Sequence, residues 1–134
     1  MLTRINHIGI AVASLDETLP FYRDNLGMAL AGVEEVAEQK VRVAMLQIGE
    51  SKIELLEPTA ANSPVARFLE KNGPGIHHLA YEVEDIEAAI ARLLANGARM
   101  IDETPRNGAH GTRIAFVHPK SSNGVLTELC EPGH

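Results

Sequence analysis

The sequence predicts an α+β fold in which two tandem βαβββ modules form a curved mixed sheet. Two observations predict it. The segment His7–Asp16 matches His78–Glu87 position by position: a histidine, an aliphatic residue, a small residue, and later a valine and an acid. The segment Glu54–Pro58 likewise matches Glu128–Pro132, so Glu54 follows His7 by 47 residues and Glu128 follows His78 by 50. A repeat of this kind indicates paired units that bury a common face.

The first module is expected within about residues 1–60. Residues 5–12 alternate apolar with small or polar side chains and predict a strand. A helix is predicted from Ser14 or Asp16 to Gly27, with Pro20 in its early part, where proline costs less. Its apolar stripe comprises Leu15, Leu19, Tyr22 and Leu26. Three strands are predicted after it, at about 30–36, 41–48 and 52–57.

The second module is expected within about residues 75–134 and repeats this order. Residues 77–83 predict a strand, and Asp85 is positioned to cap a helix that ends at Gly97. The apolar stripe of that helix comprises Ile86, Ile90, Leu93 and Leu94. Strands are predicted near 99–103, 113–118 and 125–131. A linker over about 61–74, with a short helix at 64–71, joins the modules, and we expect residues 1–134 to form one domain.

Composition excludes several classes of function. The net charge is −6 without a basic cluster, which argues against nucleic acid or an anionic membrane as the partner. No apolar run approaches the roughly 18 residues that a membrane span needs. The start of the sequence lacks a signal-peptide pattern, and a single cysteine, Cys130, excludes an intrachain disulfide. These features predict a cytoplasmic protein.

The repeat also predicts a metal site. His7 is equivalent to His78, and Glu54 to Glu128, so a pseudo-twofold pairing of the modules would bring all four together on one surface. Buried carboxylates are costly and repel each other, and a divalent cation relieves both effects. Imidazole and carboxylate ligands suit zinc, cobalt, nickel, manganese or ferrous iron. A repeat kept only for packing would explain the matched aliphatic residues but not polar residues at inward positions.

Seven segments carry a resemblance to a known family over almost the whole chain. The segments are His7–Ala11, Phe21–Arg23, Lys52–Pro58, Phe68–Gly73, Gly75–Ala80, Phe116–Lys120 and Gly124–Leu129. They resemble the vicinal oxygen chelate (glyoxalase/bleomycin resistance) superfamily and, within it, the methylmalonyl-CoA epimerases.

The resemblance implies a reaction and a cofactor. The family's metal ligands fall on the four residues that the repeat selects, and the ion would be Co²⁺, Mn²⁺, Ni²⁺ or Zn²⁺. The implied reaction interconverts (R)- and (S)-methylmalonyl-CoA by abstraction and return of the C2 proton through a metal-stabilised enolate. Glu128 would act as one base, and Glu54 or a bound water as the other. Some family members carry Gln in place of Glu54 and a second basic Glu in place of Val43, and Val43 cannot transfer a proton here.

Other residues complete the prediction. The glycine-rich segment 106–113 resembles a flap over the substrate, with an ordinary loop as an equal alternative. Lys120, Arg113 and His110 are predicted to bind an acyl-CoA, and a solvated Lys120 is an equal alternative. His77 is expected to be structural, on the strand face opposite His78. We expect a homodimer. Two alternatives stay open: a glyoxalase I-like isomerase acting on a glutathione thiohemiacetal, and a non-enzymatic protein that binds a small drug.

Overall fold

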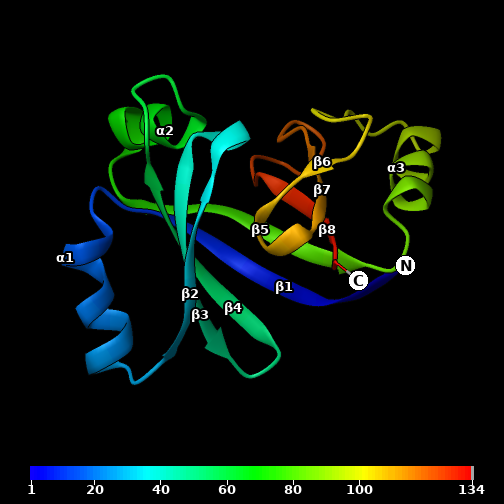
Figure 1. Cartoon of the computed structure of the whole chain (residues 1–134). Coiled ribbons are helices and arrows are strands. Elements are labelled where there is room, and N and C mark those ends of the chain that lie inside the picture. Colours follow the sequence, from blue (N-terminus) through cyan, green and yellow to red (C-terminus); the bar gives the residue numbers. More distant parts are fainter. Residues whose placement is uncertain (134) are drawn as a thin grey trace. The chain divides into compact units, whose positions relative to one another are not determined.

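The computed structural model describes residues 1–133 and contains both predicted modules (Figure 1). The strands are β1 (Leu2–Ala11), β2 (Ala29–Val36), β3 (Val41–Ile48), β4 (Ser51–Pro58), β5 (Gly75–Val83), β6 (Arg106–Asn107), β7 (Arg113–Val117) and β8 (Thr127–Glu131). The helices are α1 (Leu15–Leu19), α2 (Pro64–Asn72) and α3 (Ile86–Ala95). Short 3-10 turns lie at Ala37–Gln39 and Ala109–Gly111. The α+β class is therefore confirmed.

The chain divides into two compact units. The first unit is His7–His77, and the second unit combines Met1–Asn6 with the chain from His78 on. The division differs from the expected module boundaries, because the first half of β1 belongs with the second unit. There, Thr3 Oγ1 and Asn6 Nδ2 donate hydrogen bonds to the carboxylate of Glu82 on β5. No helix among residues 1–133 is long and apolar enough to cross a membrane.

The first unit is a four-stranded sheet covered by α1. Its strand order is β2-β3-β4-β1, with β1 parallel to β4 and the other pairs antiparallel. Ser14 caps α1 as expected, accepting a hydrogen bond from Glu17 N at 3.2 Å. The apolar face of α1 packs on one side of the sheet in a core of Val12, Leu15, Leu19, Ala44, Leu46 and Leu55. The opposite side of this sheet is therefore available for the polar residues of β1 and β4.

The second unit repeats this design around α3. Its strands run in the order β5-β8-β7-β6, with β5 parallel to β8 and the other pairs antiparallel. Asp85 caps α3 as predicted, accepting a hydrogen bond from Ala88 N at 3.1 Å. The core between α3 and the sheet comprises Val83, Ile86, Ala89, Ile90, Met100, Ala115, Val117 and Leu129.

Two predicted elements were wrong in part. The first helix is α-helical only to Leu19 and continues as a π-helical turn over Pro20–Asn25, because Pro20 has no N–H for a regular helical hydrogen bond. The turn closes with Leu26 N donating to Phe21 O at 2.9 Å, which leaves Leu26 exposed rather than in the core. Leu94 of α3 is also exposed.

The predicted strand at 99–103 does not form. Met100 makes a single bridge to Val117, and the two-residue strand β6 forms later, inside the segment expected to be a flap. Asp102 explains the interruption, because its carboxylate accepts the Phe116 N–H at 2.9 Å, a place that a strand partner would otherwise take.

Candidate metal centre

One histidine–glutamate pair lies on the first unit's sheet, on the face opposite α1. His7 and Gly9 share a face of β1, and Gly9 is paired in register with Glu54 on β4. His7 Nδ1 lies 3.2 Å from Glu54 Oε2. Both residues are buried, at 4% and 8% exposure. The strand alternation that the sequence shows therefore places this pair together.

The second unit holds the equivalent pair. Ala80 of β5 is in register with Glu128 of β8, so His78, two residues before Ala80, shares the face of Glu128. His78 Nε2 lies 3.2 Å from Glu128 Oε1, and both residues are buried. Phe116, opposite Glu128 on β7, places its ring edge-to-face against the His78 imidazole at 5.7 Å between centroids.

Both histidine–glutamate pairs have donor atoms that suit a divalent metal ion. A nitrogen and an oxygen 3.2 Å apart can each lie at the usual 2.0–2.2 Å from one cation. Imidazole with carboxylate is a donor set that divalent transition metals accept. Carboxylates as buried as Glu54 and Glu128 also need a positive partner.

A second pair of glutamates was not anticipated from the sequence. Glu57 and Glu131 lie three residues beyond Glu54 and Glu128, on the opposite strand face. Each accepts a hydrogen bond at 3.0 Å from the first backbone N–H of a helix, that of Leu15 or Ile86. Their other oxygens pair with Arg42 Nη1 at 3.0 Å and Arg113 Nη1 at 3.2 Å. The repeated Glu-Pro that ends both matched segments was the available signal.

These bonds tie β4 to α1 and β8 to α3, so each strand that carries a candidate glutamate ligand is joined to a helix. Helix N-termini favour negative charge, so the carboxylates of Glu57 and Glu131 are also attracted electrostatically to the helices whose N–H groups they accept. Asp85 and Glu87 lie near Glu131 and complete an acidic group. Arg113 already neutralises Glu87 and Glu131, so this group needs no cation.

The predicted substrate-binding residues all lie in the second unit. Arg113 Nη2 contacts Glu87 Oε2 at 2.6 Å, which raises the pKa of Arg113 and lowers that of Glu87. Lys120 is exposed in the turn after β7. His110 is exposed and adopts a left-handed backbone conformation with φ 59°. Binding of substrate by these three residues stays a prediction.

The expected flap packs on β7 through an aromatic contact. The Arg106 guanidinium lies over the Phe116 ring at 5.6 Å, and Arg106 Nε lies 3.5 Å from Asp102 Oδ2. A Cβ added at Gly108 would come within 2.7 Å of the Ile114 side chain, so only glycine allows the segment to approach β7 this closely.

One further sequence prediction is confirmed. His77 makes an edge-to-face contact with Phe68 of α2, with ring centroids 5.0 Å apart, which fits its expected structural role. Cys130 is buried within β8 and packs with Ile114 and Phe116.

Comparison with known proteins now defines the class. Residues 6–116 match the Glyoxalase/Bleomycin resistance protein/Dioxygenase superfamily, and the chain belongs to that superfamily.

The relatives that match this chain over nearly its whole length include methylmalonyl-CoA epimerases. The chain is 45% identical over 131 residues to an ethylmalonyl-CoA/methylmalonyl-CoA epimerase of Cereibacter sphaeroides, covering 96% of this chain and 98% of the relative. Methylmalonyl-CoA epimerase of Mycobacterium tuberculosis superimposes with a TM-score of 0.96 at 43% identity, over 99% of this chain and 90% of that one. A Streptomyces coelicolor methylmalonyl-CoA epimerase variant in complex with 2-nitronate-propionyl-CoA gives 0.95 at 46% identity, over 98% and 96%.

Proposed function

We propose that this protein is a metal-dependent epimerase that interconverts the (R) and (S) epimers of methylmalonyl-CoA at C2. The observation that carries the proposal is the buried histidine–glutamate pair, present once in each unit at equivalent positions of the repeat. The substrate is supported by the epimerase relatives, which match this chain over nearly its whole length.

The four residues His7, Glu54, His78 and Glu128 would hold one divalent ion, and Co²⁺, Mn²⁺, Ni²⁺ and Zn²⁺ all suit this donor set. When bound, the ion supplies Lewis acidity and a template for orienting the acyl group.

The remaining chemistry belongs to the side chains. Inversion at C2 needs a proton acceptor on one face of the acyl group and a donor on the other. Glu128 serves as one of these groups. The sequence predicts Glu54 of the first unit, or a bound water, as the other. Lys120, Arg113 and His110 would attract the anionic acyl-CoA. We further expect a homodimer located in the cytoplasm.

The proposal is tested by proton exchange. One epimer of methylmalonyl-CoA is incubated in D₂O with metal-loaded protein, and NMR follows deuterium entry at C2 together with the epimer ratio. We expect both processes in the wild type and their loss after chelation and in Glu128→Gln. A metal-loaded wild type that exchanges no C2 proton would refute the epimerase function.

A further inference from the structure

Arg99 and Lys120 are two cations of the second unit that have no carboxylate partner. Both residues are exposed, and neither side chain takes part in an ion pair or a hydrogen bond among residues 1–133. Arg113 of the same unit differs, because its guanidinium contacts the Glu87 carboxylate at 2.6 Å. Arg99 and Lys120 therefore keep positive charge that a bound anion could neutralise.

Backbone hydrogen bonds hold Arg99 beside the turn that carries Lys120. Arg99 O accepts the His118 N–H at 2.8 Å, and Arg99 N donates to Ser121 Oγ at 2.7 Å. Within the turn, His118 Nδ1 accepts the Lys120 N–H at 3.1 Å. The two cations thus come from different segments of the chain whose backbones are joined, and we call them the Arg99–Lys120 cluster.

The imidazole of His118 shows that both charges act at one place. Its pKa is lowered, first by desolvation and then by the charges of Arg99 and Lys120. Because the interaction between charges weakens with distance, both cations lie near this one ring. No carboxylate among residues 1–133 contributes to the shift. The local charge is therefore positive, although the whole chain has a net charge of −6.

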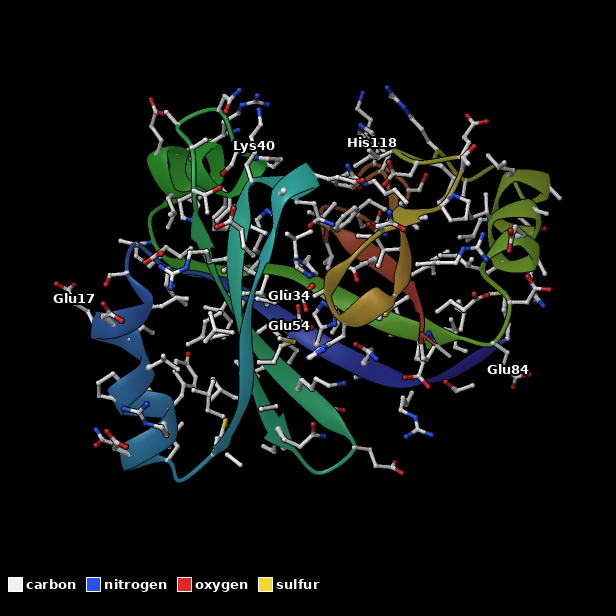
Figure 2. The ribbon with its side chains drawn as sticks, viewed as in Figure 1. Glu17, Glu34, Lys40, Glu54, Glu84 and His118 are labelled. Carbon is white, nitrogen blue, oxygen red and sulfur yellow. The ribbon has the colours of Figure 1, made fainter. Side chains whose placement is uncertain are left out.

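The Arg99–Lys120 cluster lies close to the histidine–glutamate pair of its own unit. Phe116 is paired with Glu128 across β7 and β8, and its ring contacts the imidazole of His78. His118 follows Phe116 by two residues, so their Cα atoms are no more than about 7 Å apart. Figure 2 labels His118, which lies directly after β7. The cluster is thus beside the candidate ligands without being among them.

The substrate of the proposed function carries anions of the kind that such a cluster binds. An acyl-CoA has a diphosphate and a 3′-phosphate, and a long pantetheine arm separates both from the thioester. Guanidinium and ammonium groups bind phosphate oxygens through charge-assisted hydrogen bonds. Since the phosphates lie away from the acyl group, their binding site must lie outside the ligand set, as this cluster does.

We propose, on the basis of the epimerase function above, that Arg99 and Lys120 form a subsite for a phosphate group of the CoA portion of the substrate. Each contributes one positive charge, and together they bind the anion from two segments of the chain. No bond is made or broken at this subsite. It increases the affinity for substrate, while the chemistry at C2 belongs to other residues.

Calorimetry tests the subsite without depending on turnover. Metal-loaded protein is titrated with an equimolar mixture of the two methylmalonyl-CoA epimers, with the 3′-dephospho analogue, and with the methylmalonyl thioester of pantetheine, which has no phosphate. Arg99→Gln and Lys120→Gln are each expected to weaken binding of the CoA thioester by about 3- to 10-fold. Arg92→Gln is the matched control, because Arg92 is exposed on α3 and its charge does not contribute to the shift of His118. It should bind as the wild type does.

The two analogues identify the phosphate that is bound. A loss of affinity that persists with the 3′-dephospho analogue assigns the diphosphate, and a loss that disappears with it assigns the 3′-phosphate. Equal weakening with the pantetheine thioester, or no weakening of CoA thioester binding, would overturn the subsite. The epimerase function fails separately, if the metal-loaded wild type exchanges no C2 proton. The affinity comparison remains decisive for the subsite in that case, because it needs no reaction.

Discussion

His118 lies directly after β7, and its surroundings there shift the pKa of its imidazole. Its pKa is lowered from the ordinary value of 6.5, first by desolvation and then by the charges of Arg99 and Lys120. Its Nδ1 accepts the Lys120 N–H at 3.1 Å, which requires an unprotonated nitrogen. The pKa of His118 is lower in the folded protein than in the unfolded chain, so protonation of its imidazole favours unfolding. The neutral imidazole therefore contributes its full stabilisation above pH 6.5, and this contribution is lost as the pH falls through the lower folded-state pKa. An NMR titration of the imidazole should therefore show a pKa below 6.5, and Lys120→Ala should raise it. An unchanged pKa in the variant would contradict the charge effect.

Phe116 is expected to orient His78, a proposed metal ligand, because its ring contacts the His78 imidazole edge-to-face. Phe116→Leu should weaken metal binding several-fold, as loss of groups that support a ligand does. Competition with a chromophoric chelator measures this change. Phe68→Leu is a matched control, since Phe68 contacts His77 and no ligand. Equal losses in the two variants would indicate general loosening of the fold instead.

The four candidate ligands could be predicted from the sequence. The two glutamates that join their strands to the helices, Glu57 and Glu131, could not. His7, Glu54, His78 and Glu128 recur at fixed positions in a repeat, and strand alternation determines which way each points. Glu57 and Glu131 recur as well, but a glutamate at a strand end is ordinarily solvated. Only the packing of each helix shows that its backbone N–H meets that carboxylate.

The N-terminus of helix α3 depends on the carboxylate of Glu131, which lies on strand β8. Glu131 is 8% exposed and accepts the Ile86 N–H. Glu131→Ala would leave that donor buried without a partner, so the free energy of unfolding should fall by about 1–3 kcal/mol. Urea denaturation measures it. Glu87→Ala, which removes the exposed partner of Arg113, should change stability much less. A larger effect for Glu87 would contradict this view of α3.

Element boundaries were predictable where local signals agreed. Caps at Ser14 and Asp85 and glycines with positive φ at Gly27 and Gly97 mark the helices correctly. The π-helical turn and the missing strand near residue 100 depend on longer-range competition, namely Pro20 against the helix and the Asp102 carboxylate against a strand partner. The periodicity of apolar residues in the sequence contains no signal for either of these two competing interactions.

For the whole molecule, the proposed sharing of one ion by both histidine–glutamate pairs predicts a stoichiometry. Metal analysis of the wild type should give one tightly bound ion per chain. His7→Ala and His78→Ala should each lose it, because either change removes a ligand of the same ion. Retention of half the metal in each variant would show instead that the pairs bind separate ions.

Strand β1 serves both units, since residues 2–6 belong with the second and residues 7–11 with the first. A break in the backbone between Gly73 and Gly75, after α2, would therefore not yield two self-sufficient halves. The N-terminal fragment would keep a segment that the C-terminal fragment lacks. Co-expressed fragments should consequently depend on each other to fold, and this chain could be developed into a split reporter whose reassembly is read out by metal uptake.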